Sequence, residues 1–132
     1  MVAVPPKTGV VIVDHGSKRP EANALLADVA AMFRETSGAA IVEPAHMELA
    51  GPTIADAIAA CVQQGAEEIV VHPYFLAPGR HSTEDIPRMV AEAAAQYPDV
   101  PCRVTEPLGL DARMCAVIAS RIAETLDRST VG

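Results

Sequence analysis

His15, Glu48 and His81 recur at an interval of 33 residues, and each follows a short apolar run typical of a buried β-strand. A strand, a helix and their connections occupy roughly 30 residues in a wound parallel α/β sheet. Residues one unit apart therefore return to the same end of neighbouring strands, where such folds bind ligands. Two imidazoles and one carboxylate are a ligand set for a divalent transition metal, so the spacing indicates one shared metal site.

The same repeat predicts four strand and helix units in a single domain. Strands are expected at 9–14, 40–47, 68–75 and 102–106, and the last alternates polar and apolar residues as a partly exposed edge strand does. Pro44 weakens the second strand and suggests an irregularity there.

Proline, glycine and polar residues punctuate the chain where helices should begin and end. The first helix is expected between Pro20 and Gly38, the second between 51–52 and 65, the third from 82 or 85 to 98, and the fourth from 111 to 126. Ser82 or Asp85 could cap the third helix, and Pro87 favours the later start.

Each expected helix carries an apolar stripe that should face the core. In the first helix the stripe consists of Ala22, Leu25, Leu26, Val29, Met32 and Phe33. In the last helix the expected inward face consists of Met114, Val117, Ile118, Ile122, Thr125 and Leu126.

Composition excludes several classes of protein. The net charge of −7 argues against general nucleic-acid binding, which needs a basic surface. There is no apolar run of about 18 residues and no apolar leader, so we expect neither a membrane span nor secretion, and a cytoplasmic location. The three cysteines lack CxxC spacing, which predicts reduced thiols rather than a disulfide framework or a zinc knuckle.

Other roles for the polar residues remain open at this stage. Loop histidines often cap helices or bond carbonyl groups, and Glu48 could simply be solvated. His46 and His72 lie inside expected strands, which favours structural hydrogen bonds, although an extended segment would place His46 on the same face as Glu48 as its supporting partner. A phosphohistidine at His15 is disfavoured because the preceding Asp14 would repel phosphate.

Ser17 lacks the G-x-S-x-G elbow of a serine nucleophile, so we interpret it as a helix-start residue or a hydrogen-bond donor to a ligand.

The segments VIVDHGSKRPEAN, VEPAHMELAGPTI, PGRH followed by DIP, and TEPLG together resemble the short sirohydrochlorin chelatases, most closely sirohydrochlorin ferrochelatases of the plant and bacterial type. The resemblance covers about residues 9–126. It implies a class II chelatase-like, three-layer α/β lobe with a four-stranded, mainly parallel sheet flanked by helices. We expect one lobe over residues 1–132, with flexible ends at 1–8 and 127–132.

The resemblance also implies an activity and its residues. His15, Glu48 and His81 match the family's metal site, and they would deliver Fe²⁺, or Co²⁺ in cobalt-using relatives, to sirohydrochlorin without nucleotide hydrolysis. Ser17, Lys18, Arg19 and Arg80 are the candidates for binding the carboxylates of this tetrapyrrole. The metal is a substrate, so no permanently bound cofactor is expected.

The resemblance further implies a homodimer, with no iron–sulfur cluster, and a plastid stromal location if the source is a plant or alga. A cobaltochelatase and a non-catalytic tetrapyrrole or metal carrier are the alternatives.

Overall fold

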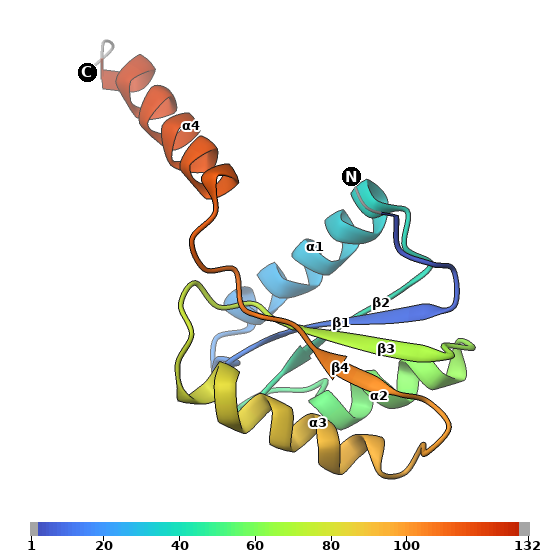
Figure 1. Cartoon of the computed structure of the whole chain (residues 1–132). Coiled ribbons are helices and arrows are strands. Elements are labelled where there is room, and N and C mark those ends of the chain that lie inside the picture. The colour runs from blue at the N-terminus through green and yellow to red at the C-terminus, as the bar shows by residue number, and fades with distance from the viewer. Residues whose placement is uncertain (1–2, 130–132) are drawn as a thin grey trace.

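Four parallel strands form one sheet in the computed structural model, which describes residues 3–129 (Figure 1). The strands are β1 (Thr8–Asp14), β2 (Ile41–His46), β3 (Glu68–Pro73) and β4 (Cys102–Val104), in the spatial order β2-β1-β3-β4. All three pairings are parallel. The predicted α/β fold with a four-stranded parallel sheet is therefore confirmed.

The helices lie on both sides of the sheet, as expected for a three-layer lobe (Figure 1). They are α1 (Pro20–Ser37), α2 (Ile54–Gln63), α3 (Ile86–Ala94) and α4 (Ala112–Ser129), with a π-helical turn η1 (His81–Asp85) leading directly into α3. Gly38 ends α1 at a positive φ of 73°, which glycine adopts without strain. Thr53 and Asp56 form a reciprocal capping box at the start of α2.

One face of the sheet, here called the closed face, is covered by α2 and α3. Its strand residues alternate along the chain, so that Val11, Val13, Ile69 and Val71 all point into this core and none is measurably exposed. Ile58 of α2 is likewise fully buried. A parallel sheet normally buries both faces in this way.

The other face, here called the open face, is covered only by α1. Val10 and Ile12 of β1 pack there against Leu26 and Ala30 of α1. On β3 the residues of this face, including Val70, remain half-buried. The expected α1 stripe is partly wrong: Leu25 and Met32 are 63% and 66% exposed, because a single helix cannot turn so wide a stripe onto the sheet.

Helix α4 extends away from the lobe rather than lying on it (Figure 1). The expected inward residues of α4 are exposed, except for the half-buried Met114, so that expectation is wrong for this single chain. The exposed members are Val117, Ile118, Ile122, Thr125 and Leu126. Asp111 does cap the helix, because its carboxylate accepts a hydrogen bond from the backbone N–H of Arg113 at 2.9 Å.

Several boundaries differ from the expected ones. Strand β2 tolerates Pro44 because it lies at the sheet edge, and β4 ends at Val104. Of the ends expected to be flexible, Thr8 belongs to β1, and 127–129 belong to α4. Residues 1–2 and 130–132 lie outside the described residues. No helix in the described part of the chain is both long and apolar enough to cross a lipid bilayer.

Candidate active site

The carboxyl ends of β1 and β2 bring His15 and Glu48 together. The loop after β2 continues to pair with the loop after β1: the N–H of Met47 donates to the carbonyl of Asp14, and that of Glu48 to the carbonyl of His15. Gly16 has a positive φ of 95°, and a Cβ there would overlap the Glu48 carbonyl oxygen. Glycine at this position therefore allows the two loops to lie against each other.

His15 and Glu48 form a close ion pair at this edge. His15 Nε2 lies 2.8 Å from Glu48 Oε1, and the two side chains are 41% and 56% exposed. His15 Nδ1 lies 3.3 Å from the carbonyl oxygen of Gly16. The ring is thus engaged through both nitrogens while still accessible from solvent.

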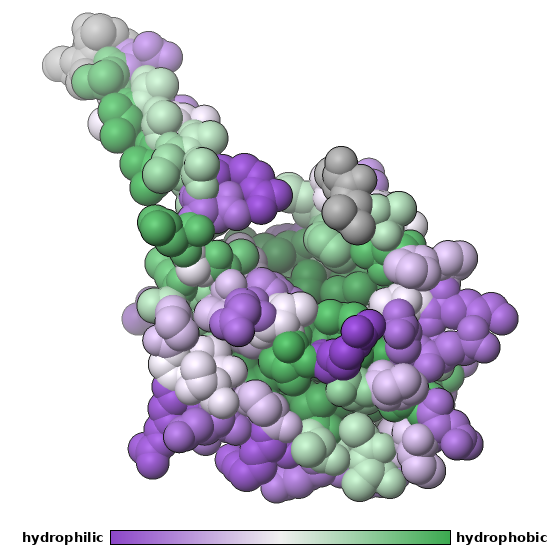
Figure 2. Space-filling model, viewed as in Figure 1, coloured by the Kyte–Doolittle hydropathy of each residue, from purple (hydrophilic) through white to green (hydrophobic). Residues whose placement is uncertain are grey.

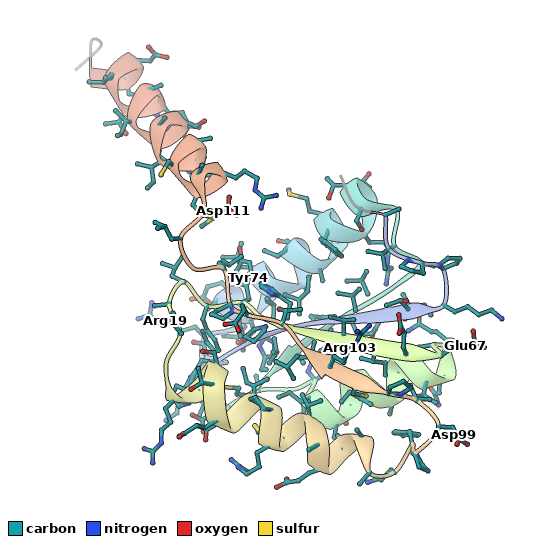
Figure 3. All side chains as sticks on the ribbon, viewed as in Figure 1. Arg19, Glu67, Tyr74, Asp99, Arg103 and Asp111 are labelled. Carbon is teal, nitrogen blue, oxygen red and sulfur yellow. The ribbon has the colours of Figure 1, made fainter. Side chains whose placement is uncertain are left out.

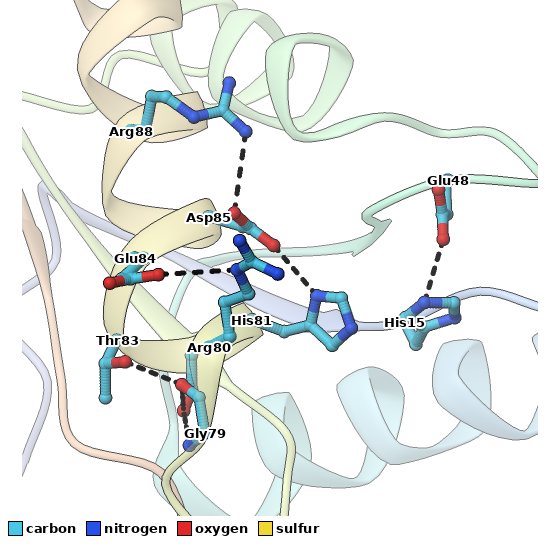
Figure 4. Close-up of polar contacts among 10 residues, drawn as sticks. His15, Glu48, Gly79, Arg80, His81, Thr83, Glu84, Asp85 and Arg88 are labelled. Atoms are coloured by element: carbon cyan, nitrogen blue, oxygen red, sulfur yellow. Dashed lines mark hydrogen bonds and ion pairs between the residues drawn. The ribbon is translucent and has the colours of Figure 1, made fainter.

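His81 reaches the same place from the loop after β3 (Figure 4). Its ring centroid lies 5.0 Å from that of His15, with the two rings inclined at 64°. The structure therefore places all three residues of the 33-residue interval at one point of the sheet edge.

Asp85 orients the His81 ring. His81 Nδ1 lies 2.9 Å from Asp85 Oδ2, and the other carboxylate oxygen lies 3.7 Å from Arg88 (Figure 4). This contact leaves Nε2 of His81 as the nitrogen available to a ligand. A carboxylate bonded to the distal nitrogen is the usual support of a metal-binding histidine, because it fixes the ring and raises its basicity.

The π-helical turn explains how His81 and Asp85 meet. Pro87 has no N–H to donate, and the N–H of Ile86 bonds instead to the carbonyl of His81, five residues earlier. The cap role expected for Ser82 or Asp85 is wrong for Asp85, whose side chain makes no cap hydrogen bond. The spacing of His81 and Asp85, four residues apart on one helical face, was the available signal for their contact.

Asp14, which precedes His15 in the chain, forms a second pair with His46. His46 Nδ1 lies 2.6 Å from Asp14 Oδ1, and the His46 side chain is only 3% exposed. The suggested support of Glu48 by His46 is wrong, because His46 Nδ1 is bonded to Asp14 and the extended conformation ends at His46. Sequence reasoning missed the partner because it lies on another strand.

His72 lies on the open face, where its Nδ1 is hydrogen-bonded to the hydroxyl oxygen of Thr105 at 2.8 Å. The structural hydrogen bond expected for this residue is confirmed. Desolvation lowers the pKa of His72, and a hydrogen bond with the backbone of Glu106 opposes that effect.

The predicted substrate-binding residues border the two histidine loops. Arg80 is highly exposed and lies 3.6 Å from Glu84, beside a shallow pocket of about 290 Å³ lined by Phe75, Leu76 and His81, among others. The hydroxyl of Ser17 accepts a hydrogen bond from the backbone N–H of Arg19, consistent with its helix-start role. Lys18 and Arg19 are exposed at the start of α1.

Within residues 3–129, no group of three or more His, Cys, Asp or Glu side chains already stands in an arrangement that could hold a metal ion. The contacts suggest a physical reason: His15 Nε2 is directed at Glu48, and His81 Nδ1 at Asp85. A shared ion would have to replace the contact between His15 and Glu48. The donor types themselves suit Fe²⁺ and Co²⁺.

A protein-family model described as CbiX matches residues 9–125, nearly the whole chain. The chain belongs to the CbiX family. Among curated relatives it is 49% identical, over 118 residues, to the chloroplastic sirohydrochlorin ferrochelatase of Arabidopsis thaliana, a match that covers 89% of this chain and 52% of the relative. It is 32% identical to a sirohydrochlorin cobaltochelatase of Methanopyrus kandleri, covering 89% of this chain and 96% of the relative.

A solved structure has the same fold. SirB from Bacillus subtilis with Fe³⁺ matches with a TM-score of 0.83 at 29% identity, over 90% of this chain and 47% of that one. The chain therefore spans about half the length of the plant relative and of SirB.

Proposed function

We propose that the protein is a sirohydrochlorin ferrochelatase, a lyase that inserts Fe²⁺ into sirohydrochlorin to form sirohaem without nucleotide hydrolysis. The observation that carries the proposal is the approach of His15 and His81 to 5.0 Å, with Glu48 beside them, at an accessible sheet edge. The 49% identity to a plant protein named for this activity supports the choice of substrate.

The three side chains supply what metal insertion requires. The enzyme must hold a divalent ion, strip its water, accept two pyrrole protons and then release the ion to four ring nitrogens. Imidazole and carboxylate ligands bind Fe²⁺ with lower affinity than thiolates bind softer metals, and they leave coordination positions open. Glu48 and the histidines can also accept protons near neutral pH.

The two histidines have different contacts, which suggest different roles in metal transfer. His81 is held by Asp85, so its Nε2 has a fixed direction. His15 instead contacts Glu48, which is more exposed and free to exchange this contact for the ion. We assign His81 as the anchored ligand, and His15 with Glu48 as the pair that releases the ion and takes up a proton.

The macrocycle would rest beside the His81 loop. Sirohydrochlorin carries several carboxylates, and Arg80, Lys18 and Arg19 are exposed cationic side chains in the two loops that carry the histidines. Arginine can bind a carboxylate through two parallel hydrogen bonds. The hydroxyl of Ser17 retains its hydrogen for a further contact, because it accepts rather than donates in its bond with Arg19.

Cobalt insertion is the second candidate. The relatives named as cobaltochelatases include one that is matched along 96% of its length. The same donors bind Co²⁺ more tightly than Fe²⁺ in the usual order of divalent metals. The choice between the two metals would then depend on supply and on the rate of release.

An anaerobic assay that follows the absorption change of sirohydrochlorin with Fe²⁺ or Co²⁺ tests the proposal. We expect wild-type turnover with Fe²⁺, and a loss of at least tenfold in His15→Ala, His81→Ala and Glu48→Gln, since each removes a metal or proton contact. Glu35→Gln, an exposed carboxylate change on α1, is the matched control. Unchanged turnover in both histidine variants would overturn the proposal, and tetrapyrrole binding without turnover in the wild type would establish a carrier.

We also propose that the protein assembles as a homodimer, as the resemblance to short chelatases implies.

A further inference from the structure

Leu49, which directly follows Glu48, combines two unfavourable features. Its φ is 71°, and among residues 3–129 it is the only residue other than glycine with a positive φ. Its side chain is also 55% exposed. A left-handed backbone brings the Cβ of an ordinary residue close to a carbonyl oxygen, so glycine or asparagine is usual there. Strain of this kind occurs mainly at functional sites, where another requirement offsets its cost.

The backbone of this loop explains the conformation of Leu49 but not the choice of leucine. The N–H of His46 donates to the carbonyl of Pro52 at 2.8 Å, and the N–H of Glu48 donates to the carbonyl of His15 at 3.1 Å. The chain bends between these fixed points. Glycine would make the same bend with less strain, so the reason for leucine lies in its side chain.

Exposure of an apolar side chain does not by itself mark a site. Figure 2 shows hydrophobic residues along one side of the projecting helix α4. Leu25 and Met32 on α1 are exposed as well. Those residues lie on regular helices, and single apolar residues are common on the surfaces of soluble proteins. Leu49 differs from them because its backbone is strained and because it adjoins a residue of the candidate active site.

The residues assigned so far contact only the polar parts of a tetrapyrrole. The histidines and Glu48 serve the ion, and Arg80, Lys18 and Arg19 serve the peripheral carboxylates. Figure 3 shows Arg19 at the end of the lobe away from Glu67 and Asp99. The faces of the conjugated ring are apolar, and pockets for small molecules are lined mainly by apolar side chains. The ring faces therefore need an apolar contact close to the metal-binding side chains.

Leu49 is placed to supply that contact. Consecutive Cα atoms lie about 3.8 Å apart, so Leu49 is immediately beside Glu48, whose Oε1 lies 2.8 Å from His15 Nε2. A tetrapyrrole surrounds the ion it receives, so its ring extends well beyond the atoms that deliver the ion. A second exposed leucine, Leu76, is 68% exposed and lines the shallow pocket beside His81. Both loops thus carry an exposed leucine near a metal-binding candidate.

We infer that Leu49 contacts the substrate, and that its side chain packs against the apolar face of the bound tetrapyrrole, with Leu76 as a second contact from the His81 loop. This inference deepens the proposed function and rests on it. Leu49 binds the ring rather than the ion, and it takes up no proton. The left-handed backbone, a cost in the free protein, is offset when the ring covers the leucine.

A comparison of stability with substrate binding tests the inference. Asparagine adopts the left-handed region more readily than leucine but offers no apolar side chain. We expect Leu49→Asn to unfold at a urea concentration equal to or above that of the wild type. The same variant should bind sirohydrochlorin about tenfold more weakly, measured by the change in sirohydrochlorin fluorescence without added metal.

Leu25→Asn is the matched control, because it makes the same substitution at an exposed leucine on α1. It should bind sirohydrochlorin as the wild type does and unfold at a lower urea concentration, since asparagine is a poorer helix former than leucine. Leu49→Met keeps both the apolar contact and the backbone strain, so its affinity for sirohydrochlorin should stay close to that of the wild type.

A titration with Co²⁺ alone separates contact with the ring from an effect on Glu48. The affinity for Co²⁺ should be unchanged in Leu49→Asn, because the substitution leaves every metal donor in place. Equal losses of Co²⁺ and sirohydrochlorin affinity would show that Leu49 only supports Glu48, and would overturn the inference. Unchanged sirohydrochlorin binding in Leu49→Asn would also overturn it.

The inference and the proposed function fail in different ways. A wild-type protein that binds sirohydrochlorin but inserts no metal would overturn the proposed activity, and the binding of Leu49→Asn would still decide the role of the leucine. Full turnover together with unchanged binding in Leu49→Asn would overturn the inference alone. A wild-type protein that binds no sirohydrochlorin would overturn both.

Discussion

The two faces of the sheet differ in how completely the chain covers them. On the closed face, two helices bury the central strand side chains, and residues such as Val71 and Ile58 have no exposed surface. On the open face, α1 packs on β1 and β2 and leaves β3 half-buried, although β1 is apolar on both sides. The difference teaches that an apolar strand sequence indicates cover on both faces, but does not specify how far along the sheet that cover extends.

The largest difference should appear between two isoleucines, one on each kind of surface. We expect Ile58→Ala to lower the free energy of unfolding by about 2 to 5 kcal/mol, because it leaves a cavity in the closed-face core. Ile118→Ala on the exposed stripe should cost about 0.5 kcal/mol or less in dilute solution. Urea unfolding measures both, and equal losses would contradict the distinction between the faces.

A high pH should weaken the closed face selectively. Burial, with a smaller contribution from the charge of Glu43, raises the pKa of the Cys61 thiol to about 12. Between pH 9 and 12 the unfolded thiol loses its proton while the folded one keeps it, so stability falls as pH rises, by up to about 1.4 kcal/mol per pH unit. Cys61→Ala should flatten this part of the urea-unfolding profile. An unchanged slope would show that the thiol does not remain protonated in the folded core.

Adjacent valines on β3 give a closer comparison. Val71 is fully buried on the closed face, and Val70 is half-buried on the open face. Val71→Ala should cost about 2 kcal/mol, since it removes two buried carbon groups, and Val70→Ala about 1 kcal/mol or less in dilute protein. Urea unfolding of both variants measures the difference, and equal losses would show that the open face of β3 is packed as tightly as the closed face.

The smallest effect is expected at an exposed ion pair between β3 and β4. Arg103 lies 3.5 Å from Glu68, and the side chains are 72% and 38% exposed. Solvent screening limits such a pair to a few tenths of a kcal/mol, so Arg103→Ala should change the free energy of unfolding by less than about 0.5 kcal/mol at low concentration. A loss above about 1 kcal/mol in dilute urea unfolding would mean that the open face is already covered there.

Much of the site could be predicted from the chain because it depends on topology. The 33-residue interval predicted that His15, Glu48 and His81 would meet at one edge, and parallel strands produce that result for any residues placed one unit apart. The contact of His81 with Asp85 was missed because Pro87 favoured a helix start near Asp85, which left His81 outside the expected helix, whereas in the structure the helical turn begins at His81.

The remaining errors concern which surfaces meet. The apolar stripe of α4 correctly predicted a helix, but a periodic pattern says only that one face needs cover, and α4 extends away from its own lobe. His46 was assigned to the wrong carboxylate for a related reason. Its partner Asp14 is 32 residues away and lies beside it only because β1 and β2 pair in register.

The most direct test of the proposed site is X-ray absorption spectroscopy of the protein loaded with one equivalent of Co²⁺. We predict two imidazole ligands together with oxygen ligands, and the loss of one imidazole in each of His15→Ala and His81→Ala. A spectrum with oxygen ligands alone, or one that is identical in all three proteins, would contradict the claim that the two histidines share one ion.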